Sequence, residues 1–165
     1  MRVFRQGDLD GLCGAYSVVN AARIVSRLDE DQCATLFETV VRYLGDAHRV
    51  TLGVGRGLMD DILRDIASGF MSSRYMPFRN RADISLSEFW STVADFLDGA
   101  QPRAVILCLD TPTPHWTTAV RATARRMELV DSGGLNTLAR RRCTTARATA
   151  ARPLRIWPSH TYLIS

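Results

Sequence analysis

The chain has 165 residues, of which 46% are hydrophobic and 23% are charged, a composition typical of a globular protein. It excludes a disordered polar chain, a collagen-like repeat and a membrane bundle, and no apolar run approaches the roughly 18 residues of a spanning helix. One domain over residues 1–165 is expected, since domains typically span roughly 100–200 residues. The N-terminus lacks the apolar core of a signal peptide. We therefore expect a soluble protein that is cytoplasmic where it is synthesised, with delivery into another cell left open.

Charge is unevenly spread along the chain. All 21 cationic residues are arginine, and the formal net charge is +4. Residues 1–101 carry 11 arginines and 14 acidic residues, whereas residues 102–165 carry 10 arginines and 3 acidic residues. This asymmetry indicates a basic face in the C-terminal half, which would suit an acidic partner.

The Arg-rich segment 139–155 concentrates this charge, with six arginines and no acidic residue. An acidic peptide, a nucleic acid or an anionic membrane could bind there. No aromatic residue lies within the segment, which argues against single-stranded nucleic acid. A solvated loop in an arginine-biased sequence is the interpretation that we favour, and an acidic partner is the alternative.

Helical periodicity dominates the first hundred residues. The first expected helix runs from Cys13 to Arg27 and directly follows Gly11 and Leu12, so Cys13 lies where the chain enters the helix. Three more helices are expected: one after the acidic cluster 29–31 that ends at Gly45, one over residues 58–67, and one from the capping pattern Ser85-x-x-Glu88 to Gly99.

The hydrophobic period changes after Pro102. Residues 103–109 form a continuous apolar run, which is typical of a central strand. Three further strands are expected over residues 115–122, 127–131 and 160–164. Helices followed by strands predict an α+β fold, in which an N-terminal helical half packs against a mostly antiparallel sheet.

Cys13 is the strongest candidate nucleophile among the four cysteines. A cysteine at a helix N-terminus lies at the positive end of the helix dipole, which stabilises its thiolate. Cys33 and Cys108 fall within apolar patterns and are expected to be structural, whereas Cys143 follows three arginines that could lower its pKa. None of the cysteines has a partner at zinc-ligand spacing, so we expect no metal and no cofactor.

His115 and Asp131 are the candidate partners of Cys13. His115 opens one expected strand and Asp131 closes the next. We expect the two strands to form a hairpin in which these residues are directly opposed, with Cβ atoms about 5 Å apart. At that distance an aspartate can hold an imidazole in the tautomer and orientation that a nucleophile needs. His48 and His160 are alternative bases, but neither has an aspartate at matching spacing.

Two loops complete the candidate site. Gln6 precedes Cys13 in the chain, and its side-chain amide could donate to an oxyanion together with the backbone N–H of Cys13. The glycine pattern Gly53-x-Gly55-x-Gly57 lacks the lysine and hydroxyl residues of a nucleotide-binding loop. We expect this segment to form a loop beside the site that shapes substrate access.

The chain resembles the papain-like cysteine peptidase superfamily through four motifs in the same order: Gln6, Cys13-Gly14, His115-Trp116 and Leu129-Val130-Asp131. Within that superfamily it is most similar to the bacterial peptidases that process double-glycine leader peptides. The resemblance implies a papain-like fold, Cys13 as the nucleophile and His115 as general base and acid. It also implies that Asp131 orients His115 and that Gln6 donates to the oxyanion. Leu12 departs from the leader peptidases, which usually have an acidic residue before the cysteine.

We therefore expect a cysteine hydrolase that cleaves a peptide or isopeptide bond in a protein or peptide substrate. A glutamine deamidase or an acyltransferase would use the same residues, because the acyl-enzyme can pass its acyl group to different acceptors. The alternative outside enzymes is a catalytically silent module that binds a peptide or nucleic acid through its basic C-terminal half.

Overall fold

The computed structural model describes residues 11–45, 53–71, 74–111 and 113–165. Its α-helices are α1 (Cys13–Ser26), α2 (Glu30–Leu44), α4 (Arg56–Asp61) and α5 (Leu86–Leu97). Its strands are β1 (Arg74–Tyr75), β2 (Ala104–Thr111), β3 (His115–Ala122), β4 (Arg126–Val130), β5 (Thr137–Ala139), β6 (Cys143–Thr144) and β7 (Leu154–Ile164). They form one sheet in the order β1-β7-β2-β3-β4-β5, antiparallel throughout, with β6 parallel to β7. The expected α+β class with a mostly antiparallel sheet is confirmed.

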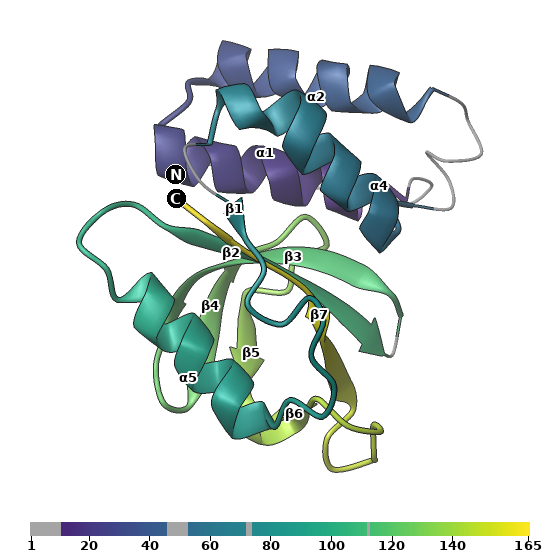
Figure 1. Cartoon of the computed structure of the whole chain (residues 1–165), viewed down its shortest axis with the longest axis vertical. Helices are drawn as coiled ribbons and strands as arrows, with labels where there is room; N and C mark the ends of the chain where they lie inside the picture. Colours follow the sequence, from purple (N-terminus) through teal and green to yellow (C-terminus); the bar gives the residue numbers. More distant parts are fainter. Residues whose placement is uncertain (1–10, 46–52, 72–73, 112) are drawn as a thin grey trace.

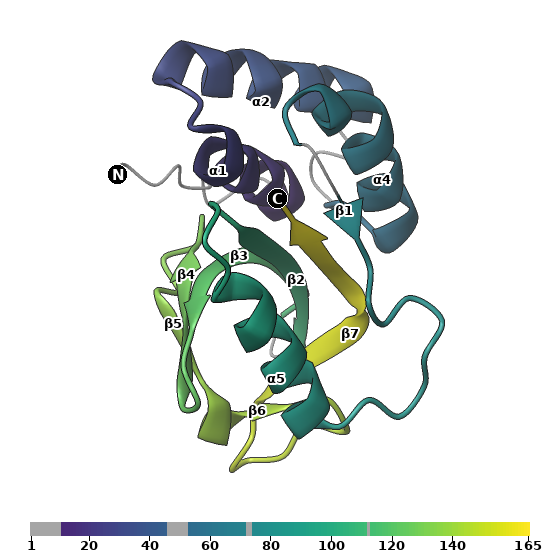
Figure 2. The ribbon, with the colours of Figure 1, turned by 60° about the vertical axis from the view of Figure 1, so that its left-hand side comes forward.

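Helices cover both faces of this sheet. α1, α2 and α4 lie on one face, where α1 packs against β2 and β3 (Figure 1). α5 lies on the opposite face, against β2, β3 and β7, and the sheet curls around it (Figure 2). The expectation of a helical half on one face is therefore only part of the arrangement, because the fourth helix covers the other. Within the described residues, none of these helices has the length and apolarity needed to cross a membrane.

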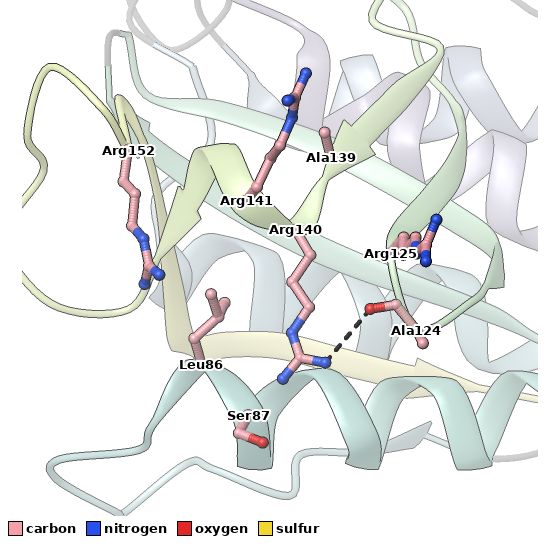
Figure 3. A pocket seen from close by; sticks show the side chains of 8 residues that line it. All are labelled: Leu86, Ser87, Ala124, Arg125, Ala139, Arg140, Arg141 and Arg152. Atoms are coloured by element: carbon pink, nitrogen blue, oxygen red, sulfur yellow. Dashed lines mark hydrogen bonds between the residues drawn. The ribbon is translucent and has the colours of Figure 1, made fainter.

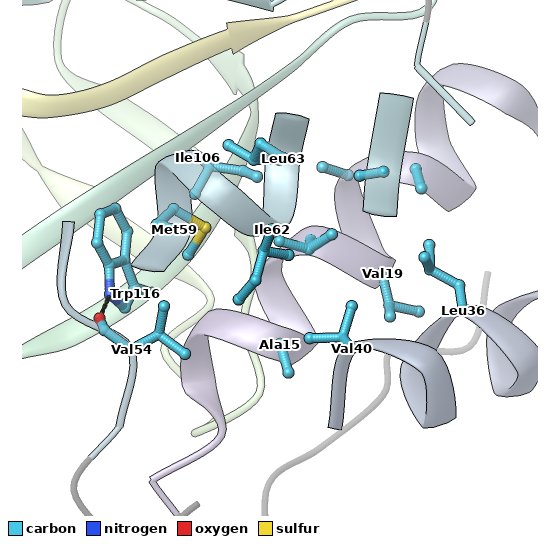
Figure 4. Close-up of a cluster of buried hydrophobic side chains, with 14 of the residues drawn as sticks. Ala15, Val19, Leu36, Val40, Val54, Met59, Ile62, Leu63, Ile106 and Trp116 are labelled. Atoms are coloured by element: carbon cyan, nitrogen blue, oxygen red, sulfur yellow. Dashed lines mark hydrogen bonds between the residues drawn. The ribbon is translucent and has the colours of Figure 1, made fainter. Parts of the chain in front are cut away.

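Strand β2 shows why helices pack on both faces of the sheet. Successive side chains of a strand point to opposite faces, and the apolar residues of β2 alternate between two cores. Ala104, Ile106 and Cys108 belong to the core under α1, and Val105, Leu107 and Leu109 to the core under α5. Figure 4 shows the first core, where Ile106 and Trp116 from the sheet meet apolar side chains of the helices. The prediction that 103–109 is a central strand is confirmed, since β2 lies between β7 and β3.

The sequence signals at the helix ends act as expected. The Asp29 side chain accepts a hydrogen bond from the backbone N–H of Gln32 at 2.8 Å, and the Gln32 side chain accepts one from the N–H of Asp29 at 3.0 Å. This reciprocal capping box starts α2, and Gly45 ends it with a φ of 81°. At the start of α5, Ser85 Oγ accepts a hydrogen bond from the N–H of Glu88 at 3.1 Å.

The helix expected over residues 58–67 is shorter than predicted. α4 ends at Asp61, and the chain continues as a π-helical turn (Ile62–Ile66) and a 3-10 turn (Ala67–Gly69). The sequence prediction also missed β1, β5 and β6, because strands of two or three residues show no measurable periodicity.

Strand β7 begins at Leu154, six residues before the predicted start at His160. Pro158 lies inside it and obscures the strand pattern, since proline cannot donate to a sheet ladder. The register to β2 shifts here: Trp157 and Thr161 pair with two adjacent residues of β2. Residues 158–160 therefore form a bulge in β7.

Candidate active site

Cys13 is the first residue of α1, as the sequence predicts. It is 8% exposed, and the backbone N–H of Trp116 donates to its Sγ at 3.5 Å, across 103 positions of sequence. Nearby, Thr118 Oγ1 donates to the carbonyl oxygen of Ser17 at 3.0 Å. These two bonds hold the start of α1 against β3, the strand that begins with His115.

His115 and Asp131 form a short hydrogen bond. His115 Nε2 lies 2.6 Å from Asp131 Oδ2, and the Asp131 side chain is fully buried. The second carboxylate oxygen, Oδ1, accepts the backbone N–H groups of Gly133 and Leu135, each at 2.9 Å. Both oxygens of Asp131 are thus acceptors in fixed positions, which holds the carboxylate and, through it, the imidazole ring.

The register of β3 and β4 differs from the prediction that His115 and Asp131 are directly opposed. Thr118 pairs with Val130, so continuing the ladder places Asp131 opposite Thr117. The predicted register was therefore wrong by two residues. A shift by two residues leaves every side chain on its original face, and diagonal neighbours on one face stay within reach. His115 and Asp131 consequently meet as diagonal neighbours.

The turn between the two strands and a bulge in β3 together set this register. The backbone N–H of Thr123 donates to the carbonyl of Arg126 at 2.8 Å, which leaves Ala124 and Arg125 as the turn residues. The turn is therefore centred later in the chain than a direct His115–Asp131 pairing would require. A β-bulge between Ala119 and Arg121 then shifts the pairing by one residue on the side of the site.

The electrostatics of the pair favour a charged imidazole. Burial acts to lower the pKa of His115, but its hydrogen bonds with Asp131 and Cys13 outweigh burial and raise this pKa to about 9. Burial acts to raise the pKa of the Asp131 carboxyl, but the hydrogen bonds from His115, Thr117 and the backbone of Leu135, with the charge of His115, together outweigh burial and lower that pKa. Each partner thus stabilises the ionised form of the other.

The hydrogen bond to Asp131 also decides which nitrogen of His115 is free. Asp131 engages Nε2, and an imidazole has two ring nitrogens, so Nδ1 is the nitrogen left for a proton transfer. Cys13 and His115 line the same pocket, and Cys13 contributes to the raised pKa of His115.

A pocket of about 560 Å³ opens in front of Cys13 and His115. Gly53, Val54 and Gly55 form one wall of it, which confirms the expectation that the glycine-containing segment lies beside the site. Gly53 has a φ of 87°, and a Cβ there would lie 3.0 Å from the Gly11 carbonyl oxygen. Glycine is therefore required where this loop passes the start of α1.

The sequence prediction missed Trp157 and named His160 only as an alternative base. Both residues line the pocket, with ring centroids 4.5 Å apart. Burial and the nearby guanidinium of Arg56 lower the pKa of His160. His160 pairs with no carboxylate among the described residues, and its Nδ1 contacts Ser159 Oγ at 3.0 Å. The bulge at 158–160 follows Trp157 and includes His160, and the rings of both residues line the pocket. The position of such a bulge cannot be predicted from hydrophobic periodicity.

Several predicted features lie elsewhere. Gln6 and His48 lie outside the described residues. Cys33, Cys108 and Cys143 are buried, and burial raises the pKa of Cys108 to about 12. Burial likewise raises the pKa of Cys143 to about 11, although Arg152 acts to lower it. The idea that neighbouring arginines lower the Cys143 pKa is therefore wrong, because desolvation outweighs their charge.

Gly14 offers a test of how closely α1 and the glycine loop are packed. A Cβ on Gly14 would lie 2.7 Å from Val54 Cβ and 3.2 Å from Met59 Cε. We expect Gly14→Ala to destabilise the protein by about 1–3 kcal/mol through overpacking, measured by urea unfolding, and to slow modification of Cys13. Gly57→Ala is the matched control, because a Cβ there meets nothing within 4 Å, and it should be neutral or stabilising by up to about 1 kcal/mol. Equal stability of the two variants would contradict the close contact.

Within the described residues, no three His, Cys, Asp or Glu side chains gather as metal ligands would. In comparisons with known proteins, no family model, no curated protein and no solved structure matches this chain.

Proposed function

We propose that the protein is a papain-like cysteine hydrolase that cleaves a peptide or isopeptide bond. The observation that carries the proposal is the arrangement of three side chains. A buried carboxylate binds His115 Nε2 at 2.6 Å, and His115 lines the same pocket as a cysteine at a helix N-terminus. The backbone N–H of Trp116, the residue after His115, donates to the Sγ of that cysteine at 3.5 Å. A nucleophile, a base and a residue that orients the base are the recurring parts of such hydrolases.

The fold supports the same proposal. A helix that begins with the nucleophile packs against an antiparallel sheet that supplies the base and the carboxylate, as in the papain-like enzymes that the sequence resembles. The pocket in front of Cys13 is lined by Trp116, Trp157 and backbone of the glycine loop. A concave site with apolar walls and a few convergent polar groups is typical of a substrate site.

The proposed mechanism uses these groups in order. The Cys13 thiolate attacks the substrate carbonyl, and the backbone N–H of Cys13, at the positive end of α1, stabilises the oxyanion. The protonated His115 then donates its proton from Nδ1 to the leaving amine, which yields a thioester on Cys13. His115, now neutral, takes a proton from water, the resulting hydroxide releases the acyl group, and the thiolate is restored.

A peptide library separates this proposal from its rivals. The wild type and Cys13→Ala are incubated with a proteome-derived peptide mixture, and the products are sequenced by mass spectrometry. New peptide termini that require Cys13 support the hydrolase. Conversion of glutamine to glutamate without cleavage would show that the enzyme is a deamidase instead. Acyl adducts on amines would show that it is an acyltransferase. Identical products from both proteins would favour a silent binding module.

A further inference from the structure

A second hollow of the described surface lies away from Cys13. It has a volume of about 740 Å³ and is lined by Leu86, Ser87, Ala124, Ala139 and four arginines, which are Arg125, Arg140, Arg141 and Arg152. We call it the basic pocket. Figure 3 shows Arg140 and Arg152 extending from their backbones toward Leu86 and Ser87. No acidic residue lines it.

The four arginines have no counter-ion in the part of the chain that the structure describes. Among the described residues, none of them forms an ion pair with a carboxylate, unlike Arg64, Arg79 and Arg81. Only Arg140 is held in place: its guanidinium donates to the carbonyl of Ala124 at 3.4 Å and lies 5.8 Å from the centre of the Trp90 ring. A net charge of four is therefore gathered around one hollow and left uncompensated, which favours an anionic ligand.

The start of α5 adds to the positive electrostatic potential in the basic pocket. Leu86 and Ser87 are the first two helical residues, and backbone N–H groups at these positions have no carbonyl partner within a helix. The acidic residue of this turn, Glu88, is neutralised by Arg81 at 2.6 Å. The positive end of the helix dipole therefore faces the arginines without an opposing charge.

The basic pocket is remote from the candidate active site. It borders the turn after β3, whereas His115 begins that strand, and the eight residues of β3 span on the order of 25 Å. The pocket also adjoins α5, while Cys13 lies on the other face of the sheet. A ligand in the basic pocket would thus be separate from any substrate at Cys13, and its binding does not depend on the proposed function.

We propose that the basic pocket binds a compact polyphosphate group. A phosphate carries a charge of about −1.5 to −2 and three acceptor oxygens. Linked phosphates can therefore accept hydrogen bonds from several arginine side chains within a small volume. The volume fits the roughly 300–1,000 Å³ of small-molecule sites. A peptide chain would carry its carboxylates farther apart, and the lining has no aromatic residue on which a nucleic-acid base could stack. The interpretation of segment 139–155 as a plain solvated loop leaves unexplained why Arg140 and Arg152 both extend toward the start of α5 (Figure 3).

Isothermal titration of the full chain with inorganic tripolyphosphate, at physiological ionic strength, tests the proposal. We expect saturable binding with one site, weakened at least about 10-fold by Arg152→Gln and by Arg140→Gln, because each loses a charged hydrogen bond. Arg152 is exposed, so its variant reports on binding even if Arg140→Gln lowers stability. The control is Arg42→Gln, which removes the same charge from an exposed position on α2 and should change the affinity by less than about 2-fold.

A parallel titration with ATP identifies the source of the phosphates. Equal affinity for ATP and tripolyphosphate supports recognition of the phosphate chain alone, whereas tighter ATP binding supports a nucleotide as its carrier. Absence of saturable binding, or an equal loss in Arg42→Gln, overturns the proposal. It is also overturned if a glutamate-rich peptide or a single-stranded oligonucleotide binds more tightly than tripolyphosphate and loses affinity in Arg152→Gln.

Discussion

Replacing Asp131 with asparagine is expected to lower kcat/KM by about 10³–10⁴-fold while the protein remains folded, the size of effect known for an enzyme triad whose aspartate is replaced by asparagine. The reason lies in the two oxygens of Asp131, both of which accept hydrogen bonds. Oδ1 accepts from the N–H groups of Gly133 and Leu135, and Oδ2 from His115. An asparagine side chain has only one acceptor oxygen. An NH₂ group therefore takes the place of either Oδ1 or Oδ2 and faces the hydrogen-bond donors that this oxygen accepted from.

Each orientation of the asparagine has a consequence. If its oxygen keeps the two backbone N–H groups, its NH₂ faces His115 Nε2 and fixes the neutral tautomer that is protonated at Nδ1. That ring cannot accept the thiol proton of Cys13. If the amide flips, its NH₂ faces two backbone donors, which leaves buried groups unpaired at about 1–3 kcal/mol each.

The measurement uses the fluorogenic form of the best peptide from the library experiment. Thermal unfolding shows whether Asp131→Asn is folded, and Asp95→Asn removes the same charge from an exposed position on α5 as a control. A variant that retains more than a tenth of the wild-type rate would show that Asp131 does not orient the base.

Removal of the imidazole should have the second large effect. In His115→Ala, we expect the rate of Cys13 alkylation by iodoacetamide at pH 6 to fall about 100-fold. Alkylation proceeds through the thiolate, and in this variant the thiolate of Cys13 loses the positive charge of the neighbouring imidazolium. The rate is measured by mass spectrometry of the peptide that contains Cys13, and the other three cysteines provide internal references.

The pH dependence has a defined sign. The pKa of His115 is raised to about 9 in the folded protein, above its ordinary value of 6.5. The stability that its protonation provides is therefore complete below pH 6.5 and is lost as pH rises through about 9. Activity should decline over the same upper range, because neutral His115 cannot protonate the leaving amine. His160→Ala tests the rival base: if it lowers alkylation more than His115→Ala does, the assignment of His115 is wrong.

Local sequence patterns determined much of the fold. Helical periodicity and the capping residues Asp29 and Ser85 predicted the helices, because caps and apolar stripes act over a few residues. The apolar run at 103–109 predicted a central strand, because a strand covered on both faces has no polar side. The same local reading placed Cys13 at a helix start and His115 at a strand start, where the structure has them.

Tertiary structure decided what these residues do together. The turn at Ala124 and Arg125 and the bulge in β3 set the hairpin register, so that Asp131 reaches His115 diagonally. The bulge at 158–160 brought Trp157 and His160 into the pocket, and packing of α5 on the second face gathered arginines from distant segments around one hollow. Contacts between residues 103 positions apart, such as Trp116 with Cys13, depend on how whole elements pack. That packing depends on contacts throughout the hydrophobic cores on both faces of the sheet, so no short stretch of sequence determines it.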